Sequence, residues 1–211
     1  LGRHMSPPAD SVTAEVAKVS PEDHLRADLY NYLGVMLARP AEDAMLDQTA
    51  SLTGDASALG EAINGLARVA KAVTPKQVQT EFDALFIGLG RGELLPYASY
   101  YLTGFLNEKP LATLRTDMSA QRISRAPNVF EPEDNIASLM EMMGGMIVGR
   151  FGDAASDATQ RGFFNKHIAP WAGHFFTDLQ SAKNSVLYAG VGAVGSAFMD
   201  IEREAFRMTA R

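Results

Sequence analysis

Apolar residues recur at intervals of three and four in one segment after another, and no segment sustains the alternation of a β-strand. This spacing places apolar side chains on one face of each successive helix. Helix-start signals accompany the spacing at Ser20-Pro21 and Thr74-Pro75, where the hydroxyl can cap the first turn and the proline fits it. The pattern predicts an all-α fold, a single-domain helical bundle of about nine to eleven helices.

The length of 211 residues suits one domain with a substantial core. Residues 1–19 are expected to be a flexible N-terminal segment, and residues 1–4 resemble the remnant of an expression tag. Residues 20–211 are expected to form the helical domain. No signal peptide is visible, and the longest nearly apolar run, from Val186 to Met199, is shorter than the roughly 20 residues that span a bilayer. A soluble protein without stable membrane insertion is therefore expected.

Charge and cysteine content narrow the function classes. The net charge of −6 argues against nucleic acid as a partner and favours a basic one. The absence of cysteine excludes disulfides, thiol catalysis and thiolate metal sites, and it fits a reducing compartment.

Two helices carry specific packing expectations. The helix that begins at Pro21 and ends before Pro40 is expected to bury one stripe, formed by Leu25, Leu29, Tyr32, Leu33, Met36 and Leu37. The run from Gly190 to Gly195 matches G-x-G-x-x-G, but a dinucleotide site needs a preceding strand and a longer βαβ unit. It is instead interpreted as a close-packing helix face made by Ala189, Ala193 and Ala197. A second glycine run, from Gly88 to Gly92, is interpreted as a helix stop.

An acidic turn, Glu131-Pro132-Glu133-Asp134-Asn135, precedes a methionine-rich helix that begins at Ile136. One interpretation is a capped, partly buried helix start, with Pro132 in the first turn and the carboxylates near the positive end of the helix dipole. The other is a surface for a basic, apolar peptide, because adaptable methionines lie beside fixed acidic groups.

Three segments, in this order, resemble the signatures of the TorD/DmsD/NarJ-type redox-enzyme maturation chaperones. Pro96-Tyr97-Ala98-Ser99-Tyr100-Tyr101 resembles P-Y-x-S-x-Y, and the acidic turn followed by Ile136 and Leu139 to Met143 resembles E-P-x-D-H-I…E-x-M. The segment from Phe163 to Trp171, continuing to Phe175 and Leu179, resembles F-x-x-H-[IL]-x-P-W…F…L. The histidine of the second signature is Asn135 here, so proton exchange by an imidazole at this position is impossible, whereas hydrogen bonding remains possible.

The resemblance implies a TorD-like helical fold and a cytoplasmic, non-enzymatic chaperone without a cofactor. Its partners would be the catalytic subunit of a molybdopterin oxidoreductase and that subunit's twin-arginine signal peptide. The chaperone would hold the enzyme back from export until its cofactor is inserted, as a monomer or a homodimer. The segment from Lys109 to Arg115 is similar to members associated with formate dehydrogenase. The residues expected to bind the peptide are Pro96, Tyr97, Ser99, Tyr101, Glu131, Pro132, Asp134, Asn135, Met140 and Glu141.

Other chemistries find little support. His167 and His174 are seven residues apart and lack the companion ligands of a zinc site, so His167 is interpreted as a hydrogen-bonded structural histidine and His174 as a surface residue. Trp171 is expected in the core. No G-x-S-x-G elbow occurs. Two alternatives stay open from the residues alone: a small hydrolase or nucleotide-binding enzyme that uses the acidic cluster, and a generic helical adaptor.

Overall fold

The computed structural model describes residues 18–210, and this part of the chain contains ten α-helices, two π-helical turns and no β-strand beyond a single isolated bridge. The all-α prediction and the expected number of helices are thereby confirmed. The predicted flexible segment, residues 1–19, falls almost entirely outside the described residues. None of the described helices is both long and apolar enough to cross a membrane.

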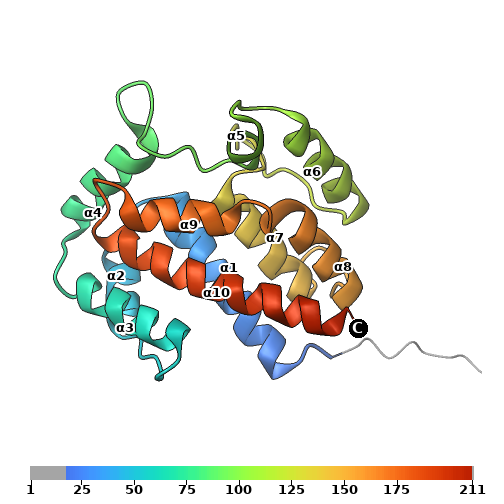
Figure 1. The fold of residues 1–211 in the computed structure, drawn as a ribbon, viewed down its shortest axis with the longest axis horizontal. Helices are drawn as coiled ribbons and strands as arrows, with labels where there is room; N and C mark the ends of the chain where they lie inside the picture. Colours follow the sequence, from blue (N-terminus) through green and yellow to red (C-terminus); the bar gives the residue numbers. More distant parts are fainter. Residues whose placement is uncertain (1–17, 211) are drawn as a thin grey trace, which may run out of the picture.

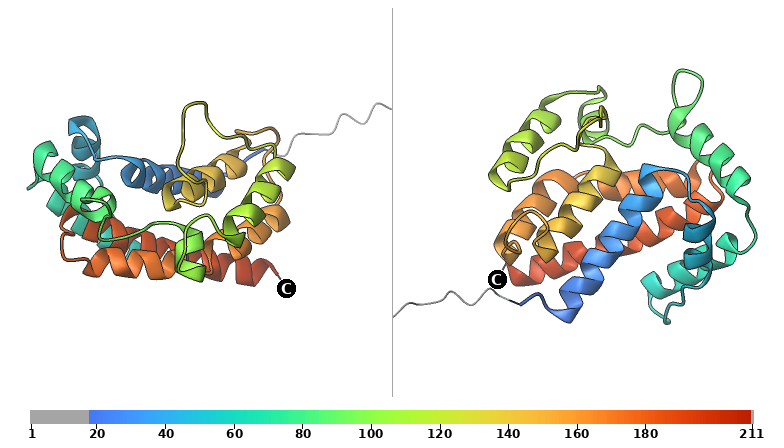
Figure 2. Two further views of the ribbon diagram at one scale, coloured as in Figure 1. Left: turned by 90° about the horizontal axis from the view of Figure 1, so that it is seen from above. Right: turned by 180° about the vertical axis from the view of Figure 1, so that it is seen from behind.

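Two layers of helices form the centre of the bundle (Figures 1 and 2). In one layer α1 packs along α7, and in the other α9 packs against α10. Helices α2 to α4 cover one end, where α3 packs on α10, and α5 and α6 lie at the other end. The bounds are α1 Pro21–Ala38, α2 Asp43–Ala50, α3 Ala58–Ala70, α4 Pro75–Phe82, η1 Asp83–Ile87, α5 Ala98–Thr103, α6 Lys109–Ala120, α7 Ile136–Val148, α8 Asp157–Phe163, η2 Phe164–Ile168, α9 Ala172–Ser181 and α10 Leu187–Thr209.

The first helix buries the expected stripe with one exception. Leu33, Met36 and Leu37 are buried, and Leu29 and Tyr32 pack partly buried against the core. Leu25 is 70% exposed instead, and Ala27 and Tyr30 also face the core. Burial of Tyr30 is possible because its hydroxyl donates a hydrogen bond of 2.9 Å to the buried Glu202 carboxylate, which also pairs with Arg26 and so joins α1 to α10.

Glycines, not alanines, make the close-packing face of α10. Gly192 and Gly195 are buried against α9, and a Cβ added at Gly192 would lie 2.9 Å from the Phe176 carbonyl oxygen. A Cβ at Gly195 would overlap the Phe176 ring. The expected face of Ala189, Ala193 and Ala197 was wrong: these three alanines are only half-buried, since the closest helix approach needs residues without a Cβ.

The start of α10 is held by a carboxylate from α4. Glu81 is buried and accepts hydrogen bonds from the backbone N–H groups of Val186, Leu187 and Tyr188, at 2.7, 3.1 and 2.7 Å. These donors belong to a helix N-terminus, where N–H groups otherwise lack partners. Glu81 thus ties the covering helices to the central layer.

Candidate functional site

The first two signature segments lie side by side. Tyr97 and Asn135 form the isolated antiparallel bridge, flanked by two backbone hydrogen bonds. The Ile136 N–H donates to the Pro96 carbonyl at 2.9 Å, and the Ala98 N–H donates to the Asp134 carbonyl at 3.0 Å. The start of α5 and the start of α7 are therefore fixed to one another, although they are far apart in the sequence.

Asp134 serves this junction. Its side chain is buried, with 1% exposed, and Oδ2 accepts a hydrogen bond of 2.8 Å from the Ser99 N–H in the first turn of α5. Ser99 is buried as well, and its Oγ accepts a bond of 3.2 Å from the Glu108 N–H just before α6. Both residues hold the α5–α6 unit against α7, and neither side chain reaches the surface.

Asn135 is the N-cap of α7. Its backbone is extended, and its Oδ1 accepts a hydrogen bond of 2.9 Å from the Ala137 N–H. The interpretation of the acidic turn as a capped helix start is confirmed at this residue, but Pro132, expected in the first helical turn, lies outside the helix, because α7 begins at Ile136. One lone pair of the amide oxygen is engaged within the protein, which leaves its second lone pair and the amide nitrogen for a ligand.

Glu133 is paired with two arginines. It is buried, and its Oε2 accepts from Arg115 Nε and Nη2 at 3.1 and 2.9 Å, while Arg125 Nε lies 3.7 Å from Oε1. Burial on its own raises the pKa of Glu133, but the hydrogen bonds from Arg115 and the two positive charges outweigh it, so that its pKa lies below the usual range. These arginines come from α6 and from the α6–α7 connection.

Among the residues that the structure describes, the Glu131 carboxylate forms no ion pair with a lysine, arginine or histidine. It is exposed, and its Oε1 accepts a hydrogen bond of 2.7 Å from the Tyr97 hydroxyl. Burial, and then this bond to Glu131, raise the pKa of Tyr97 well above its usual range. Glu131 and the exposed Glu141 are therefore the two predicted carboxylates that face solvent.

The remaining predicted residues divide between surface and core. Tyr101 is half-buried: its hydroxyl donates to Asp178 at 2.8 Å, and its ring lies 5.3 Å from the Trp171 ring, centre to centre. Pro132 is half-buried, whereas Pro96 and Met140 are buried. Trp171 lies in the core as expected. A direct peptide contact is thus geometrically open to Tyr97, Tyr101, Pro132, Glu131 and Glu141, and their role in binding stays a prediction.

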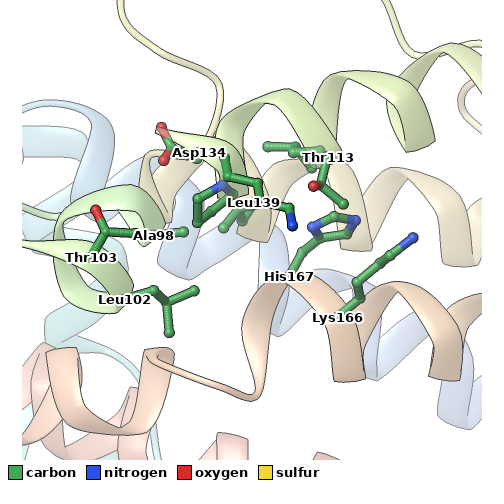
Figure 3. Close-up of a pocket in the computed structure, with 11 residues that line it drawn as sticks. Ala98, Leu102, Thr103, Thr113, Asp134, Leu139, Lys166 and His167 are labelled. Carbon is green, nitrogen blue, oxygen red and sulfur yellow. The ribbon is translucent and has the colours of Figure 1, made fainter. Parts of the chain in front are cut away.

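A cavity of about 300 Å³ opens beside this junction (Figure 3). It lies between α5, α6, the start of α7 and η2, and its walls include Leu102, Pro110, Leu114 and Leu139, with Lys109, Lys166 and His167 among the polar residues. Leu102 is also exposed at the surface, as are Phe105 and Leu106, which follow shortly after α5 in the sequence. Such an arrangement suits an apolar side chain of a partner.

His167 lines this cavity as the hydrogen-bonded histidine that was predicted. Its Nε2 lies 2.6 Å from Asp117 Oδ2, and burial lowers the pKa of His167 although the carboxylate partly opposes this. His174 is exposed, also as predicted. Within residues 18–210 no group of three or more histidine, aspartate or glutamate side chains could hold a metal ion.

Sequence reasoning missed the cavity and both arginines. The cavity walls come from four segments whose apolar residues look like ordinary core positions in the sequence. Arg115 and Arg125 stand 18 and eight residues before their shared carboxylate, outside any local spacing rule. No signal in the sequence identified the cavity or the pairing of these two arginines with Glu133.

Comparisons with known proteins agree in one direction. Residues 52–177 match the nitrate reductase delta subunit family. The chaperone protein TorD of Aliivibrio fischeri is 24% identical over 198 residues, covering 84% of this chain and 92% of that protein. TorD of Vibrio cholerae is 26% identical over 160 residues, 72% of each chain. A crystal structure from Archaeoglobus fulgidus, described as a redox enzyme maturation protein, shares the fold with a TM-score of 0.51 at 18% identity, covering 87% of this chain and 96% of that one.

Proposed function

We propose, from the premise that this chain belongs to the nitrate reductase delta subunit family of TorD-like chaperones, that it binds the twin-arginine signal peptide of a molybdopterin oxidoreductase at the α5–α7 junction. Membership of a chaperone family sets the hydrolase alternative aside. In this role the protein retains its client in the cytoplasm, bound through the signal peptide or the apo-enzyme body, until the molybdopterin cofactor is inserted.

One observation carries the proposal: solvent-facing carboxylates lie on the same junction as an apolar cavity with exposed apolar side chains beside it. Glu131 is joined to Tyr97 at the start of α5, and Leu102 at the end of α5 lines the cavity. A twin-arginine signal has the matching order, because adjacent cations precede an apolar helix-forming run. Guanidinium groups form strong charge-assisted hydrogen bonds with carboxylates.

The cavity is matched to the apolar part of such a peptide rather than to its cations. Its walls are mainly aliphatic, and Lys109 and Lys166 lie at it. Lys166 is already paired with Asp117 at 2.8 Å, so Lys109 is the one of the two lysines without an ion pair among the described residues. Its charge disfavours arginines at this cavity, and they are directed toward Glu131 and Glu141, which line a different cavity. This separation gives the bound peptide a direction.

The client subgroup rests on a short segment. Lys109 to Arg115 is similar to members associated with formate dehydrogenase, and it contributes Pro110 and Leu114 to the cavity. We propose a formate dehydrogenase as the client on this basis. Co-purification with candidate molybdoenzymes tests it: recovery of a different molybdoenzyme and not formate dehydrogenase would contradict the subgroup but not the chaperone role.

The test of the peptide site is direct titration. A fluorescent synthetic peptide with two adjacent arginines followed by an apolar run is expected to bind, and the same peptide with two lysines is expected to bind more weakly, because lysine lacks the planar fork of donors. Equal binding of both peptides would indicate an unspecific charge effect. No binding of either would contradict the proposal.

A further inference from the structure

The connection between α6 and α7 contains a strap, defined here as residues Ser124 to Phe130. Two non-glycine residues with left-handed backbone conformations, Arg122 at φ 58° and Asn128 at φ 63°, lie just before it and within it. Such conformations are uncommon for side chains other than glycine. The strap ends in Phe130, which is 87% exposed.

Beneath the strap lies a second cavity, of about 150 Å³, distinct from the one beside α5. Met118, Met142 and Phe151 contribute apolar side chains to it, and the carboxylate residues Glu131, Glu133 and Glu141 also line it. The strap itself supplies Arg125 to the same cavity. An apolar floor with a carboxylate rim suits a long side chain that ends in a cation.

One such side chain from within the protein, Arg125, already lines the cavity. Arg125 Nη2 donates a hydrogen bond of 2.8 Å to the Glu131 carbonyl, and Arg125 Nε lies 3.7 Å from Glu133 Oε1. Arg115, which does not line the cavity, pairs with Glu133 as well, so this carboxylate has two guanidinium partners. Glu141 forms no ion pair within the described part of the chain.

The two arginines are held differently. Arg115 extends from a regular helix, α6, and donates two bonds to one carboxylate oxygen of Glu133. Arg125 comes from an irregular segment and makes one bond to a carbonyl and one longer ion pair of 3.7 Å, although its side chain is less exposed than that of Arg115, at 39% against 51%. Exposed pairs of this kind are weak. Arg125 is therefore the guanidinium that can be exchanged.

We propose that Arg125 is an internal competitor for the peptide: it pairs with the Glu133 carboxylate at the cavity of Met118 and Met142, where an arginine side chain of the signal peptide binds. This inference rests on the proposed function. Binding then requires that the strap moves away, and the chaperone exchanges its own guanidinium for that of its client. The exchange lowers the net affinity, so that the client can later be released.

Affinity measurements with a matched control test the competition. Arg125→Gln is expected to bind the twin-arginine peptide about 2- to 5-fold more tightly than the wild type, the value of a weak ion pair. Arg122→Gln removes the same charge from the same connection, and the Arg122 side chain forms no hydrogen bond or ion pair among the described residues, whereas its backbone bond to the Ser119 carbonyl is kept. The affinity of Arg122→Gln therefore measures how much the loss of one positive charge alone strengthens binding of a cationic peptide.

Hydrogen exchange provides a second measurement that does not depend on affinity. In the wild type, saturating peptide is expected to speed amide exchange in residues 124–130, and in Arg125→Gln exchange there is expected to be fast already. Equal peptide affinities of Arg125→Gln and Arg122→Gln, or slower exchange of the strap on binding, would overturn the competition alone. If neither variant nor the wild type binds the peptide, the proposed function fails and the competition fails with it.

Discussion

Asp134 contacts the N–H of Ser99, 35 residues away, and this bond joins the first turn of α5 to the residue before the cap of α7. The two side chains belong to separate sequence signatures, and both are buried. Their shared task is to position the surface around them. The signature residues therefore divide into those that build the junction and those that are exposed to solvent.

Removal of the junction's carboxylate is expected to destabilise the protein. Asp134→Ala leaves the Ser99 N–H buried without its acceptor and should lower the free energy of unfolding by about 1–3 kcal/mol. Asp47→Ala, at an exposed position of α2, is the control and should have little effect. Urea unfolding measures both variants. Equal stability of the two would show that the Asp134 bond is dispensable.

Glu131 is expected to matter for the peptide and not for the fold. Glu131→Gln keeps an acceptor for the Tyr97 hydroxyl but loses the charge, and affinity for the twin-arginine peptide should fall by about 1.5–3 kcal/mol in free energy. Calorimetry checks this, with Glu61→Gln on the distant α3 as the control for net charge. An unchanged affinity would leave Glu131 with only a local structural role.

The cap of α7 predicts a pH-dependent variant. Wild-type peptide affinity should vary little between about pH 5.5 and 7.5, since Asn135 has no charge to gain.

In Asn135→His the imidazole must be neutral to accept from Ala137 N–H, which lowers its folded pKa below about 6.5. Stability is then lost as pH falls below that unfolded value. Thermal unfolding across this range measures it, and a pH-independent difference from wild type would contradict the expected cap.

The lowered pKa of Glu133 predicts acid sensitivity. A carboxyl group with a depressed folded pKa stabilises the protein above its unfolded value of about 4.5, and this contribution disappears as pH falls through the folded pKa. In Arg115→Gln the contribution is smaller, so the difference in stability from wild type should shrink below about pH 4.5. Arg68→Gln on α3 serves as control. If the difference in stability between Arg115→Gln and the wild type stayed constant down to strongly acidic pH, it would not come from the lowered pKa of Glu133.

Substitution of glycine by alanine is expected to have opposite effects on stability at Gly195, in the α9–α10 contact, and at Gly162, in α8. Gly195→Ala forces a methyl group into the Phe176 ring and should destabilise the protein by about 1–3 kcal/mol. Gly162→Ala in α8 meets nothing within 4 Å and should stabilise it by about 0.4–1 kcal/mol through the unfolded chain. Chemical denaturation compares the two. If Gly195→Ala were more stable than the wild type, the Phe176 ring or α9 would have to shift at little cost in free energy.

The fold was largely predictable because its signals are local. Ser20 caps α1 by accepting from Asp23 N–H, and Thr74 caps α4 in a reciprocal bond with Gln77, both as their sequence positions predict. The exposure of Leu25 and the burial of Tyr30 were not predictable in the same way. Leu25 fits the apolar periodicity, but Tyr30 is buried because its hydroxyl has a buried partner, Glu202, on the distant α10.

The site was predictable only in part, for a related reason. The acidic turn and the tyrosine segment stand out in the sequence, and the bridge between Tyr97 and Asn135 brings them together. Their division into buried and exposed members depends on partners distant in the sequence, such as Ser99 for Asp134 and Arg115 for Glu133. No spacing rule reaches across those separations.

The Glu81 carboxylate is synthesised long before the backbone N–H groups that bind it. Its three N–H donors are encoded 105 to 107 residues later. At a translation rate of about 5–20 residues per second, that interval lasts on the order of 5–20 s. Throughout it the Glu81 carboxylate lacks the N–H donors that it has in the folded protein, so its burial would be costly. Both residues of the bridge between Tyr97 and Asn135 are synthesised before those donors.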